Sequence, residues 1–134
     1  MSSVYKLKTE YGKITINADT VNNIVFRQLV DIEKIYILNS NKKNVSSFPK
    51  KGKINTDGII QTTKEDEGFI VDIKVAFKFG ISINEKANEI LDKVSVALEK
   101  SLGVKANKIT VNVVAVVAKK IAQRNIVIQK RYDA

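Results

Sequence analysis

The chain has 134 residues, of which 44% are hydrophobic and 28% charged, and its formal net charge is +9 at neutral pH. This length fits one domain with a sizeable core, and the composition excludes wholesale disorder. Histidine and cysteine are both absent, which excludes serine–histidine and cysteine–histidine catalysis, disulfides and thiolate metal sites. We therefore expect a protein that is not an enzyme and that uses no metal and no cofactor.

The chain also lacks the signals of membrane insertion. Residues 1–6 contain no apolar core of a signal peptide, and no apolar run approaches the roughly 18 residues that a membrane-spanning helix needs. We expect a cytoplasmic protein.

The first regular patterns are a strand and a helix. Residues 12–17 alternate, with Ile14 and Ile16 on one face, and either Asn17 or Asp19 can cap the helix that follows. Apolar residues recur in this helix at steps of three and four, which predicts one buried stripe: Val21, Ile24, Val25, Leu29 and Ile32. A short β-prone run over residues 34–38 comes next.

The middle of the chain predicts a loop and a hairpin. Residues 42–53 include the only proline, no acid and five lysines, Lys42, Lys43, Lys50, Lys51 and Lys53, which is typical of an exposed loop. The pair Asp57-Gly58 predicts a hairpin turn between residues 53–56 and 59–63. An acidic turn over residues 65–68 follows.

Residues 69–118 carry the strongest pattern. Apolar residues alternate over an expected strand, with one face in the core: Phe69, Val71, Ile73, Val75, Phe77 and Phe79. Gly80 ends this strand, and Ser82 with Glu85 has the form of a helix capping box. Apolar residues then follow at helical spacing as far as Leu102, and Gly103 lies where a left-handed C-terminal cap is expected.

Residues 109–117 predict another strand. Ile109, Val111, Val113, Ala115 and Val117 face one way, and Thr110, Asn112, Val114 and Val116 the other. Its second half is therefore apolar on both faces, so Val114, Val116 and Val117 are either covered by the C-terminal segment or bind a second copy or another protein. Residues 119–134 form a basic tail, for which a helix, an added strand and a partly ordered arm remain open.

Together these elements predict an α+β fold over residues 1–118, with a small, mostly antiparallel sheet and two helices packed on one of its faces. Glu85, Glu89 and Asp92 form an acidic stripe on the second helix, which is a candidate for Mg²⁺ or Ca²⁺ but more typical of a solvated helix face.

The basic residues give an alternative function, nucleic-acid binding. The candidate contacts are Lys42, Lys43, Lys50, Lys51, Lys53, Lys119, Lys120 and Arg124, and Tyr36 and Phe48 are near enough in sequence to stack on bases. The aromatic pattern of an RNA-recognition strand and the Gly-x-x-Gly loop of a KH module are both absent. A solubilising charged face is the competing interpretation.

Several of these segments carry a family resemblance. They are Gly12-Lys13-Ile14-Thr15-Ile16, Phe79-Gly80 with Asn84-Glu85, Leu102-Gly103-Val104 and Thr110-Val111-Asn112-Val113. Over roughly residues 11–117 the sequence resembles the alkaline shock protein family, the envelope-stress-response proteins of Gram-positive bacteria that include the Gls general-stress proteins. The resemblance implies a cytoplasmic protein without catalytic residues that serves cell-envelope homeostasis, in some members through a membrane-anchored partner, while other members are linked to the regulation of fatty-acid synthesis. Together with the two-sided apolar strand, it leads us to expect a binding or scaffolding protein that acts through self-association or protein partners. The lysine-rich loop and the tail are more basic than it implies.

Overall fold

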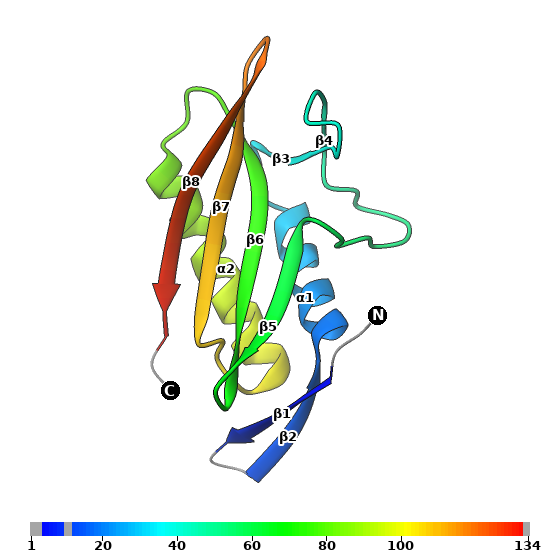
Figure 1. The fold of residues 1–134 in the computed structure, drawn as a ribbon, viewed down its shortest axis with the longest axis vertical. Coiled ribbons are helices and arrows are strands. Elements are labelled where there is room, and N and C mark those ends of the chain that lie inside the picture. The colour runs from blue at the N-terminus through cyan, green and yellow to red at the C-terminus, as the bar shows by residue number, and fades with distance from the viewer. Residues whose placement is uncertain (1–3, 10–11, 133–134) are drawn as a thin grey trace.

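The computed structural model describes residues 4–9 and 12–132, and it has two layers. One layer is a six-stranded sheet with the strand order β4-β3-β6-β7-β8, in which β5 also pairs with β6. The other layer consists of α1 and α2, which both lie on one face of this sheet (Figure 1). The predicted α+β fold with two helices on one face is confirmed.

The N-terminal strands form a separate hairpin at one end of the molecule (Figure 1). β1 (Val4–Thr9) pairs antiparallel with β2 (Gly12–Asn17), which confirms the strand predicted there. Ile16 is buried, whereas the side chain of Ile14 lies outside the described part of the structure.

The first helix, α1 (Ala18–Val30), begins as its sequence predicts. Asn17 is the N-cap, and its Oδ1 accepts a hydrogen bond from the backbone N–H of Asp19 at 2.8 Å. The predicted stripe is buried at Val21, Val25, Leu29 and Ile32, and half-buried at Ile24. This stripe is the side of α1 that packs on the sheet.

The centre of the sheet is a parallel pair. β6 (Gly68–Lys78) lies beside β7 (Lys108–Val117), and α2 (Ile83–Leu102) connects them. Ser82 Oγ accepts from the Glu85 N–H at 3.3 Å, and Gly103 has the left-handed φ of 75° that a glycine cap permits. Both predicted ends of α2 are confirmed.

The alternation predicted for β6 holds for five of its six apolar positions. Phe69, Val71, Ile73, Val75 and Phe77 are fully buried. Phe79 is 69% exposed, so its predicted place in the core is wrong. β6 ends at Lys78, and Phe79 already belongs to the turn that leads through Gly80 to α2.

Two strands share the edge of β6 that faces away from β7. β5 (Ile60–Glu65) pairs with its first half, and β3 (Ile35–Leu38) pairs with Ala76 and Phe77 near its end. β4 (Val45–Ser46) then pairs with β3. On the other side of the sheet, β8 (Ile121–Arg131) pairs antiparallel with β7, so of the three alternatives for the C-terminal segment the structure shows the added strand.

The predicted hairpin around Asp57-Gly58 is wrong, although the turn exists. The N–H groups of Ile59 and Ile60 both donate to the carbonyl of Thr56 at 3.0 Å, and Gly58 has a φ of 74°. Residues 53–56 form no strand. β5 pairs instead with the eleven-residue β6 across the acidic turn, because this long strand offers six consecutive partners and buries Ile60.

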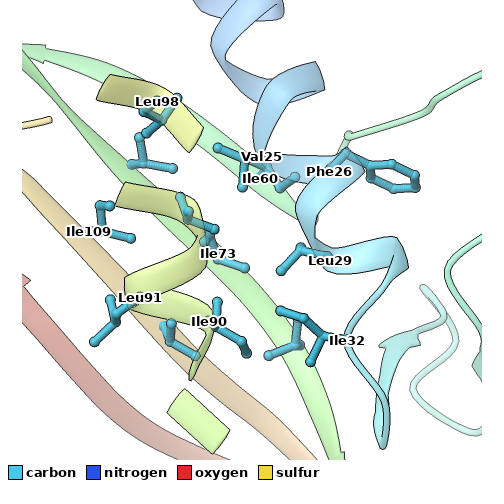
Figure 2. Close-up of a cluster of buried hydrophobic side chains, with 14 of the residues drawn as sticks. Val25, Phe26, Leu29, Ile32, Ile60, Ile73, Ile90, Leu91, Leu98 and Ile109 are labelled. Carbon is cyan, nitrogen blue, oxygen red and sulfur yellow. The ribbon is translucent and has the colours of Figure 1, made fainter. Parts of the chain in front are cut away.

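The core lies between the helices and the sheet. Figure 2 shows Ile90, Leu91 and Leu98 of α2 and Val25 and Leu29 of α1 converging on strand residues that include Ile60, Ile73 and Ile109. Each such fully buried aliphatic side chain contributes roughly 1.5–3 kcal/mol. The apolar stripes of α1 and α2 share one core with the buried face of the sheet, and both helices therefore lie on that face.

The apolar layer also contains a buried polar contact. The Thr62 hydroxyl of β5 donates to Asn22 Oδ1 of α1 at 2.7 Å, and both residues are buried. An amide oxygen buried without a donor costs about 1–3 kcal/mol. The contact therefore fixes how α1 sits against the edge of the sheet.

We predict that Thr62→Val, which removes the hydroxyl and nearly conserves shape, lowers the free energy of unfolding by about 1–3 kcal/mol. Thr63→Val is the matched control, because Thr63 is exposed on the other face of β5, and it should change stability by less than about 0.5 kcal/mol. Urea unfolding followed by circular dichroism measures both values. Equal effects of the two substitutions would contradict the assigned contact.

Candidate functional site: the open face of the sheet

The sheet face opposite α1 and α2 is called the open face here. The alternate residues of β6 are buried under the helices, so the residues between them, and their cross-strand partners, point the other way. These include Asp72, Lys74, Thr110, Asn112 and Val127. Within residues 4–9 and 12–132, no helix covers this face (Figure 1). Val127, in β8, is 51% exposed.

A β-bulge interrupts the open face. Val113 pairs with Val75 and Ala115 with Ala76, which leaves Val114 without a partner on β6. One extra residue reverses the inward and outward alternation of everything that follows. The faces predicted beyond Val113 are therefore wrong: Val116 lies opposite the buried Phe77, and Val117 lies opposite the exposed Lys78.

The three valines predicted to bind a partner are all half-buried. β8 pairs with the edge of β7 and does not cover its face, so it shields them only in part. The bulge and the reversed alternation leave Val114 and Val117 on the open face and place Val116 on the helix side. Their role in partner binding stays a prediction.

A hollow of about 310 Å³ lies around the bulge, and three basic side chains line it: Lys42, Lys74 and Arg124. Its other lining residues come from the end of β3, the turn before β5, Val114 and Gln123. We call it the basic hollow. It brings together three residues singled out from the sequence, Lys42, Val114 and Arg124, which are far apart along the chain. Lys74 was missed, although its outward position in an alternating strand was the available signal.

The remaining predicted basic contacts lie outside the hollow. Lys43, Lys50, Lys51 and Lys53 are exposed in the segment that connects β3 to β5, and Lys119 and Lys120 are exposed between β7 and β8.

Phe48 holds the lysine-rich segment against the body of the protein. Its side chain is 7% exposed, and its ring centroid lies 5.4 Å from that of Phe26 in α1 at an interplanar angle of 61°. The idea that Phe48 stacks on bases is therefore wrong, because the ring is already buried. Tyr36 is half-buried in β3.

Charge is distributed unevenly between the two layers. α1 and α2 together carry five acidic and four basic side chains, whereas residues 35–78 and 108–131 carry five acidic and fourteen basic ones. The strands and their connecting loops thus hold most of the excess positive charge. Such a surface attracts anions.

The acidic stripe on α2 is a solvated surface. Glu89 is half exposed and accepts a hydrogen bond from Lys86 Nζ at 2.9 Å. In the described part of the chain, no group of three or more acidic side chains is arranged to hold a metal ion.

Hydrogen bonds join Glu65 of the acidic turn to Arg131 and Asn107. Arg131 of β8 donates from Nη1 to Glu65 Oε1 at 2.8 Å and from Nη2 to Oε2 at 3.1 Å, and Asn107 Nδ2 donates to the Glu65 carbonyl at 3.0 Å. The hydrogen bond from Arg131 lowers the pKa of Glu65, and the same bond raises the pKa of Arg131. A bidentate pair of this kind ties the end of β8 to the hairpin of β5 and β6.

These features define a class of protein: a small two-layer α+β domain in which, within the described residues, no helix covers one face of the sheet. The sequence model of the alkaline shock protein family, described as having a cell envelope-related function, matches residues 6–118. The chain therefore belongs to the alkaline shock protein family, and the resemblance found from the sequence is confirmed.

No curated protein and no solved structure matches the chain. Neither of the described helices has the length and apolar character required to cross a membrane.

We predict that the Glu65–Arg131 pair makes stability depend on pH. Because the pKa of Glu65 is lower in the folded state, the contribution of the carboxylate is fully present above its unfolded pKa of about 4.3 and is lost as the pH falls through the folded value. Glu65→Gln should therefore have a lower urea midpoint than the parent protein at pH 7, and this difference should shrink on acidification below pH ~4.

Glu67→Gln is the control, since Glu67 is an exposed acid of the same turn that forms no ion pair with any residue the structure describes. Its urea midpoint should follow that of the parent protein over the whole pH range. If the urea midpoint of Glu65→Gln also follows that of the parent protein, the Glu65–Arg131 pair does not stabilise the fold.

Proposed function

We propose that this protein is a non-catalytic, cell envelope-related scaffolding protein that acts by self-association or by binding protein partners along β8 and the open face beside it. The absence of histidine and cysteine supports a role without catalysis. The observation that carries the proposal is the free edge of β8.

β8 is the last strand of the sheet order, and its outer edge has no partner within the described residues. The Tyr132 N–H donates to the carbonyl of Asn107 at 2.9 Å, on the β7 side. In an antiparallel ladder, alternate residues turn their polar groups to opposite sides, so Val127 and Gln129 direct N–H and C=O groups away from β7. A row of such unpaired groups is a template for an added strand.

The centre of β8 lacks the features that block edge pairing. Residues 121–131 include no proline and no glycine, and Ile126-Val127-Ile128 forms an apolar centre. Val127 is exposed on the open face at this centre, next to Asn112 of β7. A partner strand laid along β8 would cover this valine as well as the backbone edge.

We predict that Val127→Lys weakens self-association or partner binding at least about tenfold, because it places a charge in a contact that excludes water. Val96→Lys is the matched control: Val96 is 63% exposed on α2, in the other layer. Light scattering over a concentration series measures self-association, and retention on the immobilised protein measures partner binding.

Gln129→Pro tests the backbone edge, with Gln129→Ala as its control, because the Gln129 side chain lies on the open face and accepts from the Thr110 hydroxyl at 3.4 Å. Proline also removes an N–H that points away from β7, so Gln129→Pro should weaken association more than Gln129→Ala does. A parent protein that stays monomeric and retains no protein, or equal behaviour of Val127→Lys and Val96→Lys, would contradict the proposal.

The uneven distribution of charge supports a second candidate function, nucleic-acid binding. Most of the excess positive charge lies outside the helices, and Phe48 holds the segment with Lys50, Lys51 and Lys53 against the body of the protein. With the Phe48 ring buried, this mode would rely on phosphate contacts and would show little base preference.

For this candidate, we predict salt-dependent retention of duplex DNA. The logarithm of the binding constant falls linearly with the logarithm of the salt concentration, and each phosphate contact contributes roughly −0.9 to this slope. Replacing Lys50, Lys51 and Lys53 together by Gln should therefore make the slope less negative by up to about three. Lys86, Lys93 and Lys100 replaced together by Gln are the charge-matched control on α2. Fluorescence anisotropy between low and moderate salt measures the slopes, and no binding at low salt would exclude this function.

A further inference from the structure

We propose that the basic hollow is a binding site for a phosphate group carried by a small molecule or by a lipid headgroup. This proposal is independent of the association along β8, since it depends on other side chains. Its first support is the charge of the lining. Lys42, Lys74 and Arg124 line the hollow, and no acidic residue does.

None of these three cations forms an ion pair with a described residue. In the described part of the chain the ion pairs are Lys86 with Glu89 and Arg131 with Glu65, and neither involves the hollow. Arg124 Nη1 donates to the backbone carbonyl of Gln123 at 2.8 Å, which orients the guanidinium and leaves further N–H donors for a ligand. Three like charges around one hollow repel each other, and a bound dianion would remove that repulsion.

The turn that carries Lys42 is fixed in advance. The Lys42 N–H donates to the Asn39 carbonyl at 2.8 Å, the Asn39 N–H donates to the Asn44 carbonyl at 2.9 Å, and Lys42 itself has a φ of 60°. Ser46 Oγ donates to Asn39 Oδ1 at 3.0 Å, so the N–H donors of the Asn39 amide remain available to an anion. A site built this way loses little conformational entropy when it binds.

The bulge provides the space. At Val114, β7 has one residue more than β6. On the other side of β7, β8 has two residues at this level, Arg124 and Asn125, between Gln123, which pairs with Ala115, and Ile126, which pairs with Val113. Bulges re-aim side chains and are common beside binding sites. Here the bulge places Val114 of β7 in the hollow, together with Lys74 of β6 and Arg124 of β8.

The chemistry of the lining also indicates what is attached to the phosphate. Ile59 and Val114 add apolar surface next to the cations and to the amide of Gln123. A volume of about 310 Å³ is at the lower end of the range for ligand sites. Both features fit a phosphate ester with a small organic part, and glycerol 3-phosphate represents that chemistry without a lipid chain.

The test is a titration of the ¹⁵N-labelled full chain with inorganic phosphate and with glycerol 3-phosphate at constant ionic strength. Saturable shifts of the amides of Lys74, Val114 and Gln123 are expected. Lys74→Gln and Arg124→Gln should each weaken binding at least about tenfold, the loss of one charge-assisted hydrogen bond. Lys51→Gln is the matched control, because it removes one exposed positive charge outside the hollow.

A second arm distinguishes a headgroup from a free phosphate ester. It measures co-sedimentation with phosphatidylcholine vesicles with and without phosphatidic acid. Binding to phosphatidic acid that is lost in Arg124→Gln and kept in Lys51→Gln, with no shifts from glycerol 3-phosphate, assigns the site to a lipid headgroup. The proposal is overturned if neither arm shows binding, or if Lys51→Gln weakens binding as much as Arg124→Gln does.

Discussion

The parallel pairing of β6 with β7 is the constraint on which the rest of the structure depends. Parallel strands need a long connection, and α2 provides it. Because α2 and α1 pack on the same face, the other face of the pair is left without a helix in the described part of the chain (Figure 1). Parallel strands are usually covered on both faces. Here a face without a helix is tolerated because it carries polar side chains such as Asp72 and Lys74 up to the bulge.

The bulge decides what this face can do. Without it, Val114 and Val116 would lie side by side as an apolar strip, as the alternation in the sequence predicts. The extra residue turns Val116 toward the helix layer, brings Val117 to the open face and opens a basic hollow at Val114. In place of an apolar strip, this part of the sheet has a hollow lined by cations from β6, from β8 and from the turn after β3, with Ile59 and Val114 as apolar neighbours.

The sequence predicts features that depend on neighbouring residues and misses those that depend on distant ones. The ends of α2 follow from Ser82, Glu85 and Gly103, and the buried face of β6 follows from its alternation, so both could be predicted. The contacts of Thr62 with Asn22 and of Arg131 with Glu65 join residues 40 and 66 positions apart. The same holds for Phe48 on Phe26 and for Lys74 and Arg124, which line one hollow from two strands. Such contacts follow from strand order and register, and nothing in the local sequence specifies the bulge that sets this register.

The bulge also separates the two proposed activities of β8. Between Ile126 and Arg131 the strand pairs regularly with β7, whereas Gln123 and Arg124 lie beyond the irregular step. A strand added along the outer edge would find an even ladder over residues 126–131, and it would meet the change of twist where the hollow begins. Association along the edge and phosphate binding in the hollow would therefore use adjacent, non-overlapping parts of one strand. A partner on β8 could lie beside an occupied hollow without displacing its ligand, and the positive charge around the hollow would favour a partner whose nearby surface is acidic.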